Sequence, residues 1–139
     1  MTTSERPPAG PRGIVGALAE DAAADHLAEL GWTILARNLR VARDEIDIVA
    51  LEPGRRPILV VVEVRSRSGT RFGAAVESVD ARKVSRLYRA ALSLRQGNHL
   101  GLSLTVTGLP AWRVDLLALR RGPGREWLLE SHLRGLAPP

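Results

Sequence analysis

The chain has 139 residues, of which 45% are hydrophobic, and this length and composition suit one globular domain with a substantial core. It contains no cysteine, which excludes disulfides, thiolate metal sites and a cysteine nucleophile and fits a cytoplasmic location. The net charge of +5 is carried by arginine, because Lys83 is the only lysine. Arginine binds phosphate in bidentate geometry, so we expect a nucleic-acid partner, with charge that serves only solubility as the alternative. No apolar run approaches the roughly 20 residues of a membrane-spanning helix, so we expect no membrane partner.

The chain order predicts a first helix and then three strands. Residues 1–12 are polar and rich in proline, and we expect a disordered tail there. This segment has no apolar core, so we do not expect it to be a secretory signal. A single domain is expected over residues 13–139. A helical pattern starts at Gly13 and ends at Gly31. Its predicted apolar face consists of Leu18, Ala22, Ala23, Leu27 and Leu30. Apolar and β-branched runs predict strands over residues 32–41, 45–51 and 58–65, joined by short turns as in an antiparallel meander.

A second helix and two further strands follow. Residues 66–73 are expected to form a mobile loop, and Asp80 is expected to cap a helix that runs to Gln96. The predicted buried stripe of this helix consists of Val84, Leu87, Tyr88, Ala91 and Leu92. Strands are predicted over residues 112–119 and 126–132, and a short one over residues 102–106. The order predicts an α/β fold with a mixed sheet flanked by helices.

Two predicted neighbouring strands carry carboxylates within apolar runs. Alternation places Glu45, Asp47 and Val49 on one face of their strand and Ile46 and Ile48 on the other. The next strand is expected to present Leu59, Val61, Glu63 and Arg65 on a single face. A charge inside a buried strand destabilises the fold unless a partner ion or a metal compensates it.

In a suitable register Asp47 and Glu63 converge, with Cβ atoms about 5 Å apart if the residues are directly opposite. Two carboxylates at that distance repel each other unless a proton or a cation lies between them. Because oxygen ligands favour Mg²⁺ or Mn²⁺, we predict that Asp47 and Glu63 bind one of these ions. Glu20 would complete the site if the first helix packs over the strand ends. The competing explanation is simple ion pairing of Glu63 with Arg65 or Arg67, and of Asp47 with Arg43 or Arg37.

An acid on one strand followed by Glu-x-basic on the next is the arrangement of PD-(D/E)xK nucleases. The chain resembles the bacterial YraN family of endonuclease-like proteins, which is distantly similar to archaeal Holliday-junction resolvases. The segments that carry the resemblance are residues 16–23, 35–38, 45–50, 62–67 and 71–79, Lys83, and residues 113–117. The resemblance implies a restriction-endonuclease-like core, an antiparallel meander joined by a parallel strand after a crossover helix. It also implies that Glu20, Asp47 and Glu63 are the acidic site and that position 65 is the basic position of the motif.

Three positions depart from the family pattern. Ala19 and Asp44 stand where the family has glycine, and Arg65 stands where the family has lysine. Arginine cannot act as a base, and its planar head does not reproduce an ammonium group, although it can hold a phosphate or orient a water molecule.

These patterns lead to three hypotheses of function. The first is a metal-dependent endonuclease that hydrolyses phosphodiester bonds of DNA, including branched DNA, with Glu20, Asp47, Glu63 and Arg65 as catalytic residues. The side chains expected to contact nucleic acid are Arg37, Arg65, Arg67, Arg71, Lys83 and Arg86. The second is a nucleic-acid-binding protein impaired in cleavage because of Arg65, and the third is a protein-interaction domain. A homodimer would suit a two-fold substrate, and Asp115 is expected to be a buried paired acid or a support for the site.

Overall fold

A computed structural model describes residues 11–67, 79–96 and 111–138, and for residues 11–15 it describes the backbone only. Four of the expectations above lie partly or wholly outside these residues. They are the tail over residues 1–10, the loop beyond Arg67, the candidate nucleic-acid contact Arg71 and the short strand over residues 102–106.

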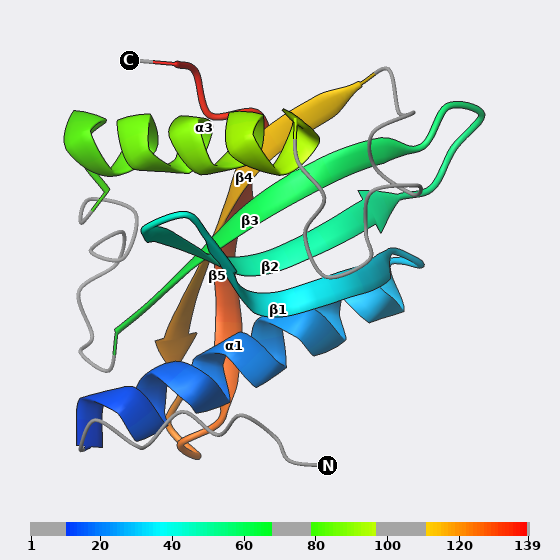
Figure 1. The fold of residues 1–139 in the computed structure, drawn as a ribbon. Coiled ribbons are helices and arrows are strands. Elements are labelled where there is room, and N and C mark those ends of the chain that lie inside the picture. Colours follow the sequence, from blue (N-terminus) through cyan, green and yellow to red (C-terminus); the bar gives the residue numbers. More distant parts are fainter. Residues whose placement is uncertain (1–10, 68–78, 97–110, 139) are drawn as a thin grey trace, which may run out of the picture.

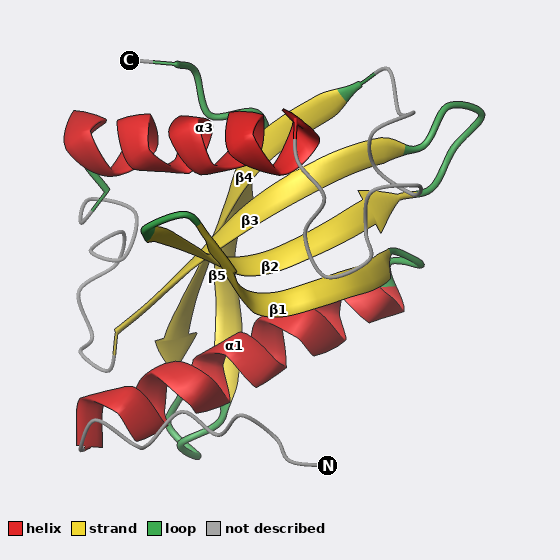
Figure 2. Ribbon diagram, in the orientation of Figure 1, coloured by secondary structure: helices red, strands yellow, loops and turns green. Residues whose placement is uncertain are grey.

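The described residues form a five-stranded mixed sheet between two helices (Figure 1). In chain order the elements are α1 (Pro11–Glu29), β1 (Thr33–Val41), β2 (Asp44–Glu52), β3 (Ile58–Arg67), α3 (Ala81–Gln96), β4 (Trp112–Arg121) and β5 (Trp127–Leu133). The strands lie in the order β1-β2-β3-β4-β5, and the β3–β4 pair is parallel while the others are antiparallel. α3 belongs to the crossover that parallel pairing requires. The predicted α/β fold, a meander plus one parallel strand, is therefore confirmed (Figure 2).

α1 ends where the sequence predicted, at a glycine in the left-handed region. Gly31 has φ of +89°, and its N–H donates to the Ala28 carbonyl at 2.9 Å. The Trp32 N–H donates to the Leu27 carbonyl at 3.0 Å, which completes a Schellman motif. The beginning of the helix differs from the prediction, because α1 starts at Pro11 and residues 11 and 12 belong to it rather than to a tail. Proline suits a first helical turn, since its missing N–H would have no partner there.

The buried face of α1 is made mainly of alanine. Ala19, Ala23, Ala24 and Leu27 are buried, and all but Ala19 pack with Ile48, Ala50, Val60, Val62, Leu117 and Leu119 of the sheet. The predicted face was wrong at both ends, because Leu18 is 48% exposed and Leu30 is 43% exposed. Small side chains let the helix backbone approach the sheet closely, so the buried stripe follows alanine rather than the larger leucines.

α3 covers the opposite face of the sheet. Its buried residues are Leu87, Ala90, Ala91 and Leu94, which pack with Leu39, Val41, Ile46, Val49, Leu59, Val61 and Val114. Leu92, predicted to be buried, is 45% exposed. The predicted cap is confirmed, because Asp80 Oδ1 accepts the Lys83 N–H at 3.0 Å.

The pairing between β2 and β3 stops where the candidate acids lie. It runs from Glu52–Ile58 to Ile48–Val62, a register that would next place Asp47 opposite Glu63. At this point a side-chain hydrogen bond replaces the backbone hydrogen bonds between the strands, because Asp47 Oδ2 accepts the Val64 N–H at 2.8 Å. β2 bends here with the β1–β2 hairpin (Figure 1). Consequently Ile46 packs with the α3 side and Ile48 with the α1 side, so the prediction that these two share a face was wrong.

β3 keeps the predicted alternation. Val61 lies on the α3 side of the sheet, while Val60 and Val62 lie on the α1 side. The strand extends to Arg67, so Ser66 and Arg67 belong to it rather than to the predicted loop. None of the described helices is long and apolar enough to cross a membrane.

Candidate active site

Asp47 and Glu63 meet at the end of the β2–β3 ladder. Glu63 is 3% exposed, and its carboxyl group is hydrogen-bonded to that of Asp47. Asp47 also accepts the backbone N–H of Val64, which fixes its orientation. The pairing of these two acids that alternation and register predicted is therefore present in the structure.

The surroundings of the pair disfavour two negative charges. Burial, followed by repulsion from Asp47, raises the pKa of Glu63 from its ordinary 4.5 to about 7. Burial likewise raises the pKa of Asp47, although the hydrogen bonds from Val64 and Glu63 act in the opposite direction. These effects favour a pair that carries one proton over a pair that carries two negative charges. Such a pair binds either a proton or a cation.

Two cationic side chains contact the same oxygen of Glu63. Arg65 Nε lies 3.2 Å from Glu63 Oε2, and Lys83 Nζ of α3 lies 3.4 Å from it. Arg65 Nε is buried and, among the residues that the structure describes, finds no hydrogen-bond acceptor with good geometry. Of the ion pairs considered from the sequence, Glu63–Arg65 is confirmed, and Lys83 is a second partner of Glu63 that sequence reasoning did not predict.

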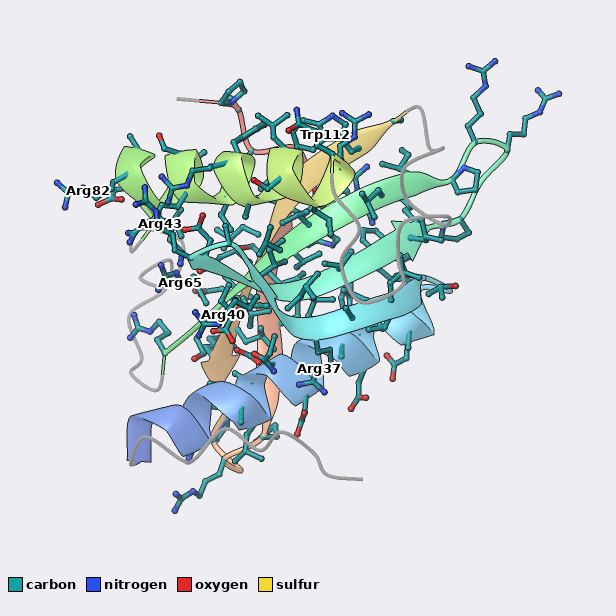
Figure 3. All side chains as sticks on the ribbon, in the orientation of Figure 1. Arg37, Arg40, Arg43, Arg65, Arg82 and Trp112 are labelled. Carbon is teal, nitrogen blue, oxygen red and sulfur yellow. The ribbon has the colours of Figure 1, made fainter. Side chains whose placement is uncertain are left out.

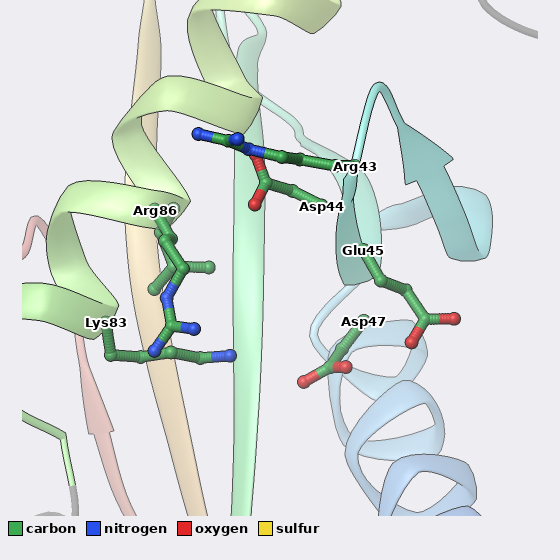
Figure 4. A pocket seen from close by; sticks show the side chains of 7 residues that line it. Arg43, Asp44, Glu45, Asp47, Lys83 and Arg86 are labelled. Atoms are coloured by element: carbon green, nitrogen blue, oxygen red, sulfur yellow. The ribbon is translucent and has the colours of Figure 1, made fainter.

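A pocket of about 200 Å³ opens beside these groups. It is lined by Arg43, Asp44, Glu45, Asp47, Lys83, Arg86 and Leu87. Figure 4 shows Lys83 extending from α3 toward Asp47, with Arg86 on the same helix and Arg43 at the β1–β2 end. The pocket thus places carboxylate oxygens and the cationic groups of Arg43, Lys83 and Arg86 within one small volume.

Glu20 is not brought into this cluster. It is half-buried on α1, and within the described ranges no group of three His, Cys, Asp or Glu residues could together hold a metal ion. Metal binding by Asp47 and Glu63 and the role of Glu20 both stay predictions.

The predicted nucleic-acid contacts fall into separate groups. Arg65 and Lys83 contact Glu63, and Arg86 lines the pocket. Arg37 lies instead beside α1, where its Nη2 contacts Asp21 Oδ1 at 2.8 Å. Figure 3 shows Arg37 apart from Arg43, Arg65 and Arg82, which lie near the N-terminal turn of α3. Of the predicted contacts, Arg65, Lys83 and Arg86 therefore lie at the pocket end of the sheet, and nucleic-acid binding there stays a prediction.

Asp115 has a structural role that the sequence left open. It is fully buried on β4, and its oxygens accept hydrogen bonds from Arg113 at 2.7 and 2.9 Å and from the Gly135 N–H at 2.9 Å. Its Oδ2 also lies 2.9 Å from His132 Nε2. Burial acts to raise the pKa of Asp115, but the bonds to His132 and Arg113 outweigh it and hold the pKa below its ordinary value. The interpretation of Asp115 as a buried paired acid is confirmed.

Asp44 also has a partner that the sequence did not reveal. Its carboxylate forms a bidentate ion pair with Arg89 of α3, at 2.8 and 2.9 Å. The hydrogen bond from Arg89 lowers the pKa of Asp44. This pair links the start of β2 to the helix that carries Lys83. The only available signal was the acid at a position where the resemblance expects glycine.

These features define a class of α/β proteins in which a mixed sheet, covered by one helix on each face, presents a carboxylate pair beside a pocket lined by both acidic and basic side chains. The chain belongs to the family described as "Uncharacterised protein family UPF0102", whose profile matches residues 19–119. The family resemblance stated from the sequence is thereby confirmed.

Relatives in this family match most of the chain. A UPF0102 protein of Sorangium cellulosum is 46% identical over 124 residues, which cover 89% of this chain and 81% of that protein. A UPF0102 protein of Deinococcus radiodurans is 49% identical over 87 residues, or 62% of this chain and 69% of that protein. A Mycobacterium relative is 38% identical over 127 residues, covering 91% of this chain and 87% of that protein. Among solved structures, Pyrococcus furiosus SfsA in complex with Ca²⁺ aligns with a TM-score of 0.33 and 15% identity, over 91% of this chain and 65% of that one.

Proposed function

We propose that this protein is a metal-dependent endonuclease that hydrolyses phosphodiester bonds, with DNA as the favoured substrate. The observation that carries the proposal is the Asp47–Glu63 pair, in which Glu63 is buried. The pair lies beside Lys83 and Arg65 and borders a pocket with two arginines. A carboxylate pair alone would suit many reactions. Its combination with phosphate-binding cations favours phosphoryl chemistry.

The residues present fit a divalent metal ion. The pair offers only oxygen donors, and two carboxylates with water and phosphate oxygens are what Mg²⁺ typically takes, while Mn²⁺ accepts similar ligands. Burial raises the pKa of both acids, and repulsion from Asp47 adds to the rise at Glu63; a cation between them would relieve that cost. Asp47 and Glu63 would hold the ion, and the hydrogen bond from Val64 keeps Asp47 in place for it. When bound, the metal would polarise the scissile phosphate and lower the pKa of a bound water.

The reaction has a simple balance. The oxygen of one water molecule forms a bond to phosphorus, one phosphorus–oxygen ester bond breaks, and the products are a phosphomonoester and a free hydroxyl group. The water loses a proton to solvent and the leaving oxygen gains one. Arg43 and Arg86 would hold the phosphates on either side of the scissile bond, since both line the pocket and arginine binds phosphate through two N–H groups.

The test is a cleavage assay on duplex, branched, flapped and single-stranded DNA, with Mg²⁺ and with Mn²⁺. We expect metal-dependent products from the wild type and a loss of at least about 100-fold in Glu63→Gln and in Asp47→Asn. Asp25→Asn on the exposed side of α1 is the matched control, because it removes one carboxylate away from the pocket. Undiminished cleavage by Glu63→Gln would contradict the proposal.

A second function is favoured by one specific observation, the arginine at position 65. A nucleic-acid-binding protein that keeps this fold without cleavage would bind DNA or RNA in the presence of EDTA, with steep salt dependence and no products. Cleavage gained by Arg65→Lys would then identify the substitution as the cause. We place either activity in the cytoplasm, and sedimentation with and without DNA would test the homodimer suggested by two-fold substrates.

A further inference from the structure

We infer that Lys83, on the helix, supplies the catalytic cation that the nuclease motif places on the strand at position 65. The inference rests on the proposed endonuclease function and assigns to Lys83 a role beyond the phosphate binding expected from the sequence. Lys83 is the only lysine of the chain, and it lies at the acidic pair although 20 residues separate it from Glu63 in the sequence.

The geometry supports this assignment. Lys83 Nζ is 3.4 Å from Glu63 Oε2, and the same side chain lines the pocket that Asp47 borders. Figure 4 shows the lysine pointing from α3 toward Asp47. Its side chain is 27% exposed, so the ammonium group is held at the acids and is still accessible from the pocket. A phosphate bound there would lie within reach of both the carboxylates and the ammonium group.

The backbone around Lys83 is held in place by two sets of contacts. Its N–H donates to Asp80 Oδ1 at 3.0 Å, which fixes the first turn of α3. Leu87, Ala90 and Leu94 then bury the helix against the sheet. A cation that acts in a transition state must be positioned before the reaction, and this anchoring provides such positioning.

The two cations at Glu63, Lys83 and Arg65, differ in the contacts that their charged groups can make. An ammonium group is compact and has three donors that rotate freely, so it can contact a water molecule and a phosphate oxygen at once. Arg65 meets Glu63 through Nε, and its planar head has a fixed direction. We assign to Lys83 the stabilisation of negative charge on the phosphate and the orientation of the attacking water, with no proton transferred to or from it. Arg65 remains a neighbour that balances the charge of Glu63.

The first experiment compares kinetic constants of Lys83→Ala, Lys83→Arg and the double variant Arg65→Lys/Lys83→Ala. We expect Lys83→Ala to lower kcat about 100-fold or more with little change in KM, since the lost contact acts mainly in the transition state. Lys83→Arg should not restore the rate, whereas the double variant should recover part of it. Arg56→Ala is the control, because it also removes one positive charge. Arg56 lies in the loop between β2 and β3, at the end of these strands away from the acids. A wild-type kcat in Lys83→Ala would overturn the inference.

The second experiment needs no cleavage, because a single lysine gives a single side-chain signal. The protein is produced with lysine labelled by ¹³C at Cε and ¹⁵N at Nζ, and the signal is followed by NMR during titration with Mg²⁺ and with Mn²⁺. We expect a shift with Mg²⁺ and strong paramagnetic broadening with Mn²⁺, both reduced in Glu63→Gln. If the wild type cleaves no substrate but Lys83 responds in this way, the endonuclease proposal fails while the placement of Lys83 at the metal site holds. A signal that neither ion affects would overturn the placement.

Discussion

Substitution of Glu63 by glutamine should remove most of a pH dependence that is built into the fold. The pKa of Glu63 is about 7 in the folded protein against an ordinary 4.5, so the folded state binds this proton more tightly than the unfolded chain does. The free energy of unfolding must therefore fall as the pH rises from about 4.5 to about 7. At about 1.4 kcal/mol for each factor of ten in proton affinity, the total for this one group is roughly 3 kcal/mol.

Glutamine has the shape of the protonated acid and keeps a donor toward Asp47. The variant should therefore keep the packing of this side chain and lose only its titration with pH. The measurement is urea unfolding in EDTA at about pH 5 and about pH 8, for the wild type and for Glu63→Gln. We expect the wild type to lose roughly 2 to 3 kcal/mol more than the variant between these two conditions. The variant should then be the more stable protein at the higher pH.

Titrating groups outside the acid pair do not obscure this comparison. The pKa of His26 is lowered, chiefly by burial, so His26 makes the folded protein more stable as the pH rises, the opposite direction to Glu63. Because His26 is present in both proteins, its effect cancels in the difference. The pKa of Asp115 is lowered from an ordinary 3.8, so its effect on stability changes only at pH values below the range used. Equal pH dependence in the two proteins would refute the reasoning that burial and Asp47 raise the pKa of Glu63.

Three further predictions follow from the acids, the core and the pocket. A proton would compete with the proposed metal at Glu63, so Mn²⁺ affinity measured by calorimetry should fall as the pH drops below about 7, and Asp47→Asn should weaken binding at every pH. Leu94→Ala should destabilise the protein by about 2 to 5 kcal/mol in urea, because this side chain is fully buried between α3 and the sheet; a smaller cost would mean that the core collapses around the gap. Arg86→Ala should reduce the slope of log affinity for DNA against log salt by about 1, and an unchanged slope would remove Arg86 from the phosphate-binding residues.

The sheet could be predicted from the sequence because strand alternation is a local property. Val60, Val61 and Val62 occupy the faces that the period of two gives them, and Glu63 continues that pattern. The same rule failed for Ile46 and Ile48, because the β2–β3 pairing ends at Ile48. Beyond that point the Asp47 side chain, in place of a backbone carbonyl, accepts the N–H of Val64. A local period cannot reveal where two strands separate.

The helices were predicted in extent better than in orientation. Alanine tolerates both buried and exposed positions, so the alanine-rich α1 carries little information about its face, and Leu18 was assigned to the wrong side. For the candidate site, the acids could be found because charges within apolar strands are unusual. Lys83 could not be assigned to Glu63, since its position depends on the rotation of α3 over the sheet.

The Asp47–Val64 contact makes one backbone amide a reporter on the acid pair. In the rest of the β2–β3 ladder, amide hydrogens are held by carbonyl groups whose charge does not change. The Val64 amide is held by a carboxylate, so its chemical shift and its rate of exchange with deuterated solvent depend on what Asp47 binds. A change at the acids is thus communicated to the main chain of β3 through a single hydrogen bond, and a backbone NMR spectrum can detect it without any label placed at the site.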